Sequence, residues 1–538
     1  MSTTNVPFGI KVVQKIAGTC CSSVNFNRNR WFPVSVWILT FLTYTYYHAT
    51  RKPISVVKTI LNRNCTGLVP PPHTNTSDEN WCDWKPFDRP DASSLLGALD
   101  SSFLFAYAAA MFISGIVAER VNLRYFLTVG MIMSGISCCL MGVARIYNIH
   151  SLWYFIGVQV MGGIFQTTGW PGVVTVMGKW FERERRGLIM GIWNSHTSIG
   201  NILGTVIASH YLDADWALSF ITPGWQMIAL AGLVFLFLAP SPKDVGCPEP
   251  DRHLQTATAH KRFGAASNGG YRRIPTAGGS LADNEEQDEA DSVISSDSDL
   301  LTQEENVQRN NEDHPILSNP KERAVGFCGA LCIPGVIEYS LCLFFAKLVS
   351  YTFLFWLPLY INSSTTLSPK HSADLSTVFD VGGIFGGIVA GIISDSSSMS
   401  ATTCVVMFVL AIPMLFVYHL YGGDNLMTNG AMLLVAGALV NGPYALITTA
   451  VSAELGTHSS LAGNSKALAT VTAIIDGTGS IGAAVGPLLA GIVSSSLSWQ
   501  YVFYMLMLSD LMALLLLIRL MVGEMRRWRE AKRVAWNS

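Results

Sequence analysis

About twelve long apolar stretches run through the 538 residues of this sequence. Each is close to the roughly 20 residues that cross a bilayer as a helix, and their polarity does not alternate as it does in the strands of a membrane barrel. Only 13% of the residues are charged, whereas a soluble protein has about 25%. The sequence therefore predicts an all-α membrane protein with twelve transmembrane helices. These are expected near residues 31–53, 93–117, 122–144, 152–178, 187–210, 219–240, 333–361, 372–394, 401–421, 428–451, 466–493 and 499–522.

Lysine and arginine residues are concentrated in alternate loops, which the positive-inside rule assigns to the cytosol. Cations precede the first expected span, follow the last one, and fill the loops between spans two and three and between spans four and five. In contrast, the loops at residues 211–217, 422–428 and 494–498 have no lysine or arginine. Residues 1–30 and 523–538 are therefore expected in the cytosol, as an N-terminal segment and a C-terminal tail.

The first loop on the opposite side, residues 54–92, has a distinct composition. It contains two glycosylation sequons, at Asn64 and Asn75, and two cysteines, Cys65 and Cys82. Short sequons also arise by chance, but they are used only outside the cytosol, where a cysteine pair can form a disulfide. We expect a lumenal loop that is glycosylated at Asn64 and Asn75 and joined by a Cys65–Cys82 disulfide.

Residues 242–330 interrupt the apolar pattern. They are rich in serine, asparagine, glycine and acidic residues, a composition that cannot bury a core. We expect a disordered cytosolic linker here, with six spans on each side. The expected domains are therefore an N-terminal bundle over residues 31–241 and a C-terminal bundle over 331–522.

The two halves carry related patterns at corresponding places. Span two ends in Gly115, Glu119 and Arg120, followed by Arg124, and span eight ends in Gly391-Ile-Ile-Ser-Asp395. The small residue permits close helix packing, and the acid faces the positive N-terminal end of a neighbouring helix. The paired patterns resemble the cytoplasmic gate motif of the major facilitator superfamily. That resemblance implies two six-helix bundles with a substrate site between them near the midplane.

Three cations lie within or at the deep end of apolar segments. Arg51 and Lys52 end the main apolar run of span one, and Lys347 lies inside span seven. Each costs roughly 2.5–3.5 kcal/mol to place within a membrane by insertion scales, so an anionic partner is expected. One alternative is that Arg51 and Lys52 reach the membrane surface and anchor the span. Another is that Lys347 forms an internal salt bridge, with Asp380 or Asp476 as candidates.

Aromatic and imidazole groups accompany these cations. Tyr47 and His48 precede Arg51, and Tyr351 follows Lys347 by one helical turn on the same face. A guanidinium is a planar fork that suits a phosphate group. Adjacent helical residues point about 100° apart, so Arg51 and Lys52 need not face the same space.

A polar and aromatic string in spans four and five resembles the signature of the organophosphate:phosphate antiporters. It contains Gln166-Thr-Thr-Gly-Trp170-Pro, then Arg-Gly, then Trp193-Asn194-Ser-His196. Matches to the sugar-phosphate exchanger branch, solute carrier family 37, extend over both halves. They include the segments Arg51-Lys-Pro-Ile-Ser, Ala346-Lys347-Leu-Val-Ser-Tyr-Thr-Phe-Leu and Asn441-Gly-Pro-Tyr-Ala-Leu.

This resemblance implies a glucose-6-phosphate:phosphate exchanger of the endoplasmic reticulum membrane that works by alternating access. Arg51 is then the phosphate-binding arginine, and His196 lies near the substrate. Lys347 stands where bacterial relatives have arginine. The expected substrate site is completed by Tyr47, His48, Lys52, Gln166, Trp170, Asn194 and Tyr351. The expected partners are inorganic phosphate, a sugar phosphate and membrane lipid, with no cofactor, metal or nucleic acid.

Other functional classes are separable from this one. A proton-coupled organic-anion transporter would use Asp380, Asp476 and His196 as proton carriers. A membrane phosphatase would need a nucleophile with acid and base partners, or a metal cluster, and the sequence has neither pattern. A receptor that has lost transport is a third possibility, although the cations expected in the cavity are intact.

Overall fold

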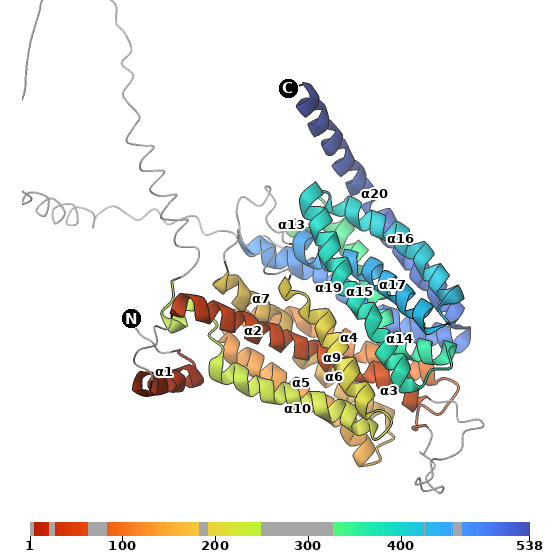
Figure 1. Ribbon diagram of the computed structural model, residues 1–538, viewed down its shortest axis with the longest axis horizontal. Helices are drawn as coiled ribbons and strands as arrows, with labels where there is room; N and C mark the ends of the chain where they lie inside the picture. Colours follow the sequence, from red (N-terminus) through yellow and green to blue (C-terminus); the bar gives the residue numbers. More distant parts are fainter. Residues whose placement is uncertain are drawn as a thin grey trace, which may run out of the picture. The chain divides into compact units, whose positions relative to one another are not determined.

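A computed structural model describes residues 5–20, 27–62, 83–181, 192–248, 327–423, 425–452, 455 and 465–537. Within these ranges the regular elements are all helical. The described residues of both halves belong to one compact unit, formed by Met1–Asp251 and Val325–Ser538 (Figure 1).

The first half contains long helices and also two pairs of helices that follow one another directly, α2 with α3 and α6 with α7. Its elements are α1 (Phe8–Cys20), α2 (Arg28–Ala49), α3 (Pro53–Leu61), α4 (Ala92–Arg120), α5 (Leu123–Ile146), α6 (Leu152–Gln166), α7 (Gly169–Trp180), α9 (His196–Tyr211), α10 (Trp216–Phe237) and η2 (Pro242–Val245). The second half contains α13 (Phe327–Leu331), α14 (Val336–Ser364), α15 (Pro369–Ser397), α16 (Ser400–Tyr421), α17 (Leu426–Leu446), η3 (Ile447–Val451), α19 (Ser465–Ser496) and α20 (Trp499–Asn537).

Nine helices of the described residues are long and apolar enough to cross a membrane. They correspond to the spans expected near 93–117, 122–144 and 219–240 and to all six spans of the second half. The other three expected spans contain α2 with α3, α6 with α7, and α9, each of which is shorter or less apolar.

Two of these three expected spans are interrupted, one near the C-terminal end of 31–53 and the other near the middle of 152–178, and the prediction of one continuous helix in each was wrong. The first break, at Thr50–Lys52, precedes Pro53, which cannot donate a helical hydrogen bond. The second, at Thr167 and Thr168, precedes Pro171. The carbonyl of Thr167, which Pro171 leaves without its helical donor, accepts a hydrogen bond from Ser114 Oγ at 2.9 Å. Hydropathy averages over such breaks, so the apolar pattern does not reveal them.

Glycines bring helices close together in the same way in both halves. In the first half, a Cβ at Gly200 or Gly204 of α9 would lie less than 3.0 Å from a carbonyl oxygen of the first span. In the second half, a Cβ at Gly482 or Gly486 of α19 would lie less than 3.0 Å from a carbonyl oxygen of α14. Backbones that approach so closely exclude any side chain, so α2 packs on α9 much as α14 packs on α19.

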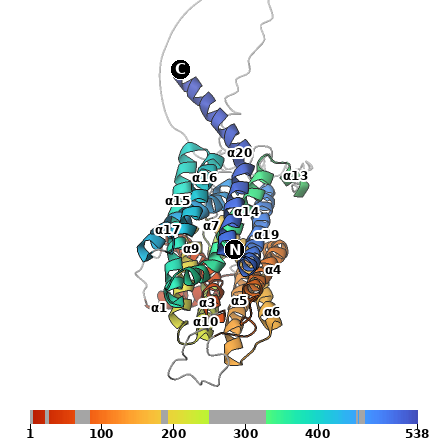
Figure 2. The same ribbon diagram turned by 90° about the vertical axis from the view of Figure 1, so that its right-hand side faces the viewer.

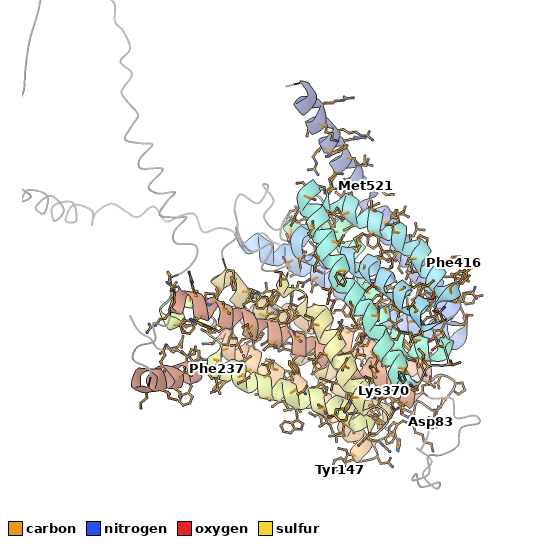
Figure 3. All side chains as sticks on the ribbon, in the orientation of Figure 1. Asp83, Tyr147, Phe237, Lys370, Phe416 and Met521 are labelled. Carbon is orange, nitrogen blue, oxygen red and sulfur yellow. The ribbon has the colours of Figure 1, made fainter. Side chains whose placement is uncertain are left out.

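The two halves contact each other through α4 and α19, α9 and α15, and α3 and α14 (Figures 1 and 2). Ser94 Oγ and Ser495 Oγ are 2.7 Å apart, and Ser209 Oγ donates to Asp374 at 2.5 Å. We call this region the closed end. Asp83, Tyr147 and Lys370 lie toward this end of the helices (Figure 3).

The opposite end carries the gate patterns of the sequence. Gly115 and Gly391 belong to those patterns, and a Cβ at either position would have no described heavy atom within 4 Å. Arg120 and Asp395 are exposed. These four residues therefore lie outside any packed contact between the halves, whereas Arg124, the other described residue of the patterns, is buried.

Candidate functional site

Arg51 lies in the break between α2, which ends at Ala49, and α3, which begins at Pro53. The side chain is only 6% exposed. Its Nε donates to Gln166 Oε1, and its guanidinium carbon lies 4.9 Å from the ring centroid of Tyr107 and 5.8 Å from that of Phe103. Its Nη2 is buried with no hydrogen-bond partner among the described residues. Arg51 is thus a buried cation with donor capacity left over.

Gln166 holds Arg51 from the second helix break. Gln166 is the last residue of α6, and its Nε2 donates to Thr50 Oγ1 at 3.1 Å. With its nitrogen committed to Thr50, its oxygen faces Arg51. The two breaks are therefore joined, and the partner of Arg51 is neutral rather than acidic.

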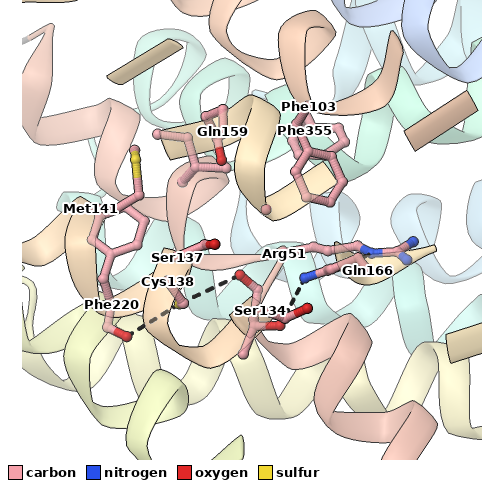
Figure 4. Close-up of a pocket in the computed structure, with 13 residues that line it drawn as sticks. Arg51, Phe103, Ser134, Ser137, Cys138, Met141, Gln159, Gln166, Phe220 and Phe355 are labelled. Carbon is pink, nitrogen blue, oxygen red and sulfur yellow. Dashed lines mark hydrogen bonds between the residues drawn. The ribbon is translucent and has the colours of Figure 1, made fainter. Parts of the chain in front are cut away.

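A cavity of about 30 Å³ lies beside Arg51, and most of the residues that line it belong to the first half (Figure 4). Ser134, Ser137, Cys138 and Gln159 contribute polar atoms to its wall, and Phe355 of α14 also lines it. A volume of roughly 10–15 Å³ holds one water, so this space fits about two waters. It gives one side of Arg51 a small polar pocket.

Lys347 lies in the middle of α14 and is buried. Its Nζ is 2.7 Å from Asp476 Oδ1 of α19 and 5.7 Å from the ring centroid of Tyr444. Of the two acids that the sequence offered as internal partners, Asp476 is the one in contact. The charge of Lys347 is therefore balanced by an acid of its own half.

Two tyrosines connect the surroundings of Arg51 and Lys347. Tyr107 of α4 and Tyr351 of α14 each lie close enough to both cations to interact electrostatically with them. Arg51 and Tyr107 belong to the first half, and Lys347 and Tyr351 belong to the second. Sequence reasoning missed Tyr107, whose only signal is one hydroxyl in the apolar run Phe103-Leu-Phe-Ala-Tyr-Ala-Ala-Ala.

His196 opens α9 and is fully buried among aromatic rings. Its ring centroid is 4.3 Å from Trp193 and 4.6 Å from Tyr44, both edge to face, and 6.2 Å from the stacked ring of His48. His196 Nε2 and His48 Nδ1 have no hydrogen-bond partner among the described residues. The cluster combines apolar ring faces with two unused imidazole nitrogens.

The remaining predicted site residues of the first half surround this cluster. Tyr47 is fully buried, and its hydroxyl is 2.7 Å from Thr168 Oγ1. Trp170 is half-buried, with its ring centroid 5.3 Å from that of Tyr44. Asn194 is half-buried in the turn before α9. Tyr47 therefore bridges the broken helices, whereas Trp170 and Asn194 retain accessible surface.

Lys52 contacts none of the residues that contact the Arg51 side chain. Its Nζ donates to the Leu354 carbonyl of α14 at 3.0 Å and is 3.8 Å from Asp380 Oδ2 of α15. Lys58, which the apolar pattern places after the buried part of span one, is fully buried and paired with Asp100. Sequence reasoning missed this pair, because its partners come from two different stretches, 42 residues apart.

Several predictions concern side chains outside this site. Arg124 is buried and donates to the Asn5 carbonyl at 3.3 Å. The side chain of Glu119 lies outside the described residues, as do Asn64, Asn75, Cys65 and Cys82 and most of the linker. Within the described part of the chain, no group of three or more His, Cys, Asp or Glu side chains is arranged to hold a metal ion.

Comparisons with known proteins agree with this architecture. A family model described as Major Facilitator Superfamily matches residues 87–471. The glucose-6-phosphate exchanger SLC37A2 of Danio rerio is 51% identical over 505 residues, which cover 94% of this chain and 95% of that protein. The Homo sapiens SLC37A2 is 50% identical over 508 residues, with 94% and 95% coverage. The glucose-6-phosphate exchanger SLC37A1 of Mus musculus is 49% identical over 519 residues, with 93% and 95% coverage.

Two solved structures share the fold at low sequence identity. One is a D-xylose-proton symporter, with a TM-score of 0.56, 13% identity, and coverage of 90% of this chain and 97% of that chain. The other is a bacterial homolog of the human lysosomal transporter Spinster, with a TM-score of 0.55, 14% identity, and coverage of 92% and 96%. At these identities the likeness concerns the fold alone.

Proposed function

Because the chain belongs to the glucose-6-phosphate exchangers of the major facilitator superfamily, we propose that it exchanges inorganic phosphate for a sugar phosphate, with glucose 6-phosphate as the favoured substrate. The exchange takes place by alternating access in the endoplasmic reticulum membrane. The phosphoryl group binds between Arg51 of the first half and Lys347 of the second. No catalytic chemistry is required of the protein.

The observation that carries this proposal is the unused hydrogen-bonding capacity of Arg51. Its Nη2 has no partner among the described residues, and its Nε bonds to a neutral amide. A buried cation normally has an anionic partner, and a planar fork suits a phosphate oxygen pair. Tyr107 and Tyr351 add hydroxyl donors close to both cations.

The contact between Asp476 and Lys347 suggests how Lys347 takes part in the transport cycle. In the empty carrier the Lys347 ammonium is held by Asp476 at 2.7 Å. A phosphate that enters competes for the same ammonium and links it to Arg51 across the two halves. The bound anion thereby joins the bundles, which favours crossing with substrate over crossing without it and produces exchange rather than leak.

The sugar part of the substrate is assigned to the aromatic and imidazole cluster. Trp170 and Asn194 are half-buried, and His196 Nε2 and His48 Nδ1 lack partners among the described residues. Ring faces pack against the apolar face of a sugar, and imidazole nitrogens bond to its hydroxyls. The unused nitrogens are the feature that supports this assignment.

The orientation follows from the charges of the loops. Both termini and the gate patterns lie on the cytosolic side, and the loop at residues 54–92 lies in the lumen. The closed end is then the lumenal end, and the gate residues Gly115, Glu119, Arg120, Arg124 and Asp395 surround the cytosolic opening. Glycosylation at Asn64 or Asn75 tests this orientation directly.

The proposal is tested by exchange of labelled phosphate in proteoliposomes loaded with glucose 6-phosphate. Arg51→Ala is expected to lower exchange by about 100-fold or more, since the phosphate loses its charged partner in a desolvated site. Arg529→Ala, an exposed arginine of the tail, is the matched control and should exchange normally. Wild-type exchange by Arg51→Ala would sink the proposal.

Proton-coupled uptake of an organic anion is the second candidate, because Asp476 is a titratable group in contact with Lys347. It predicts uptake driven by an imposed pH gradient without phosphate inside the liposomes. The exchange proposal predicts that uptake requires internal phosphate or sugar phosphate and that the pH gradient alone drives none.

A further inference from the structure

Two lysines of the first span reach across the interface at the closed end. Lys52, immediately before α3, donates to the Leu354 carbonyl at 3.0 Å, and Lys58 donates to the Phe355 carbonyl at 3.2 Å. Both acceptors are consecutive backbone groups of α14, in the other half. The lysines are 2% and 0% exposed, so neither ammonium is held by bulk water.

Pro358 explains why α14 offers such an acceptor. In a helix the carbonyl of Leu354 normally receives the N–H of residue 358, and proline has none. Away from water, a carbonyl without a donor is costly. Lys52 supplies the missing hydrogen bond from the opposite half. The contact is therefore specific to this place in α14 and is encoded by the proline.

Each lysine is also close to a carboxylate. The carboxylate near Lys52, Asp380, has its described polar partners in the opposite half. Asp380 of α15 accepts from Asn201 Nδ2 of α9 at 2.9 Å and lies 3.8 Å from Lys52. Both of these partners belong to the first half. When the halves part here, Asp380 loses both, and Lys52 loses both of its own. Lys58 keeps Asp100, which is in its own half.

We propose that this network is a latch that holds the closed end of the cavity, and that Lys52 is a gate residue rather than a ligand of the substrate. The latch consists of Lys52, Lys58, Asp100, Asn201, Asp380 and the carbonyls of Leu354 and Phe355. The inference concerns the transport cycle of the proposed function. It separates the adjacent residues Arg51 and Lys52: the first retains a free donor for the anion, and the second is committed to the opposite half.

The latch also accounts for how the closed end opens. Opening breaks three charge-assisted hydrogen bonds between the halves, from Lys52, Lys58 and Asn201, and exposes Asp380 and Lys52 to water. Such bonds are stronger than neutral ones, so they set the balance between the state closed at this end and the state open at this end. Weakening the latch shifts that balance toward the open state without removing a contact to phosphate.

The balance is measured by double electron–electron resonance between spin labels at Tyr147→Cys and Lys370→Cys, with the native cysteines replaced. These positions lie toward the closed end on different halves (Figure 3). In the absence of substrate, Lys52→Met is expected to raise the ratio of long to short distances by about tenfold or more, as for loss of a hydrogen bond from a charged donor. Lys11→Met, an exposed lysine of α1, should leave the ratio unchanged.

A second variant identifies the bond that is lost. Pro358→Ala restores the N–H that satisfies Leu354, and it should raise the ratio as well. Combined with Lys52→Met it should add little, because both changes remove the same interaction. Asn201→Ala removes the other partner of Asp380 and should raise the ratio less. This variant replaces Lys52→Met in the test if Lys52→Met does not fold.

The outcomes separate the latch from the proposed function, because the ratio is measured without substrate. An unchanged ratio in Lys52→Met together with lost binding of inorganic phosphate overturns the latch and makes Lys52 a ligand. Full additivity of Lys52→Met and Pro358→Ala also overturns it. A raised ratio in a protein that exchanges no phosphate would leave the latch standing while the proposed function falls.

Discussion

The surroundings of Arg51 and the latch both bury cations, but they satisfy them differently. In the latch, Lys52 and Lys58 each contact an acid and a backbone carbonyl. Outside the latch, Arg51 bonds to the neutral Gln166 and keeps a buried nitrogen without a partner among the described residues. A buried cation that is fully satisfied maintains a structure, whereas one with unused donors is prepared for a ligand. Burial alone does not distinguish the two.

Lys347 stands between these cases. It is paired with one acid, Asp476, yet it shares Tyr107 and Tyr351 with Arg51. Its partner lies on the same half of the molecule, so the pair can persist in every state of the cycle. The comparison therefore predicts that Asp476 competes with the substrate for Lys347.

The largest effect is expected from breaking the Lys347–Asp476 pair. Lys347→Ala leaves a carboxylate without a partner beside the anion site, so we expect phosphate exchange to fall by about 100-fold or more. The double variant Lys347→Ala/Asp476→Asn removes that negative charge and should recover part of the activity. A double variant no better than the single one would refute competition at Lys347.

A smaller effect is expected at the neutral partner of Arg51. Gln166→Glu supplies an acid of nearly the same shape, which should pair with Arg51 and raise the KM for phosphate by about tenfold. Gln166→Leu removes the hydrogen bond without adding charge and should raise KM less. Equal KM values for the two variants would show that the charge of this residue is irrelevant to the anion.

The smallest effect concerns stability rather than transport. A Cβ at Gly204 would lie less than 3.0 Å from the Ala49 carbonyl oxygen, next to the break that carries Arg51. Gly204→Ala is expected to cost about 1–3 kcal/mol of stability through overpacking. Gly115→Ala, where a Cβ has open space, should unfold at the wild-type temperature. Thermal unfolding in detergent compares the two variants. An equal decrease in unfolding temperature would contradict the difference in packing between Gly204 and Gly115.

The fold class and the family were predictable from the sequence, and the comparisons confirm both. Length and hydropathy indicate a helical membrane bundle, and long motifs such as Gln166-Thr-Thr-Gly-Trp170-Pro identify the branch. Charges inside apolar segments single out Arg51 and Lys347 from the sequence alone. Their roles in binding remain a prediction for the exchange assay.

What sequence reasoning missed depends on contacts between distant segments. The partner of Lys52 is a carbonyl made available by Pro358, 306 residues away by the difference of their numbers, and a backbone acceptor has no sequence signature. Lys58 follows the first expected span in the sequence, and hydropathy does not show that the fold buries it completely. The helix breaks at Thr50–Lys52 and Thr167–Thr168 were missed because averaging over a span hides a local interruption.

The most direct test of the account is equilibrium binding of inorganic phosphate by two variants of adjacent residues. Isothermal titration of purified Arg51→Ala and Lys52→Met against wild type measures the ligand role of each side chain without transport. The account predicts that Arg51→Ala weakens binding by about 100-fold or more, while Lys52→Met binds phosphate nearly as tightly as wild type. Loss of binding in Lys52→Met with binding retained in Arg51→Ala would contradict the account.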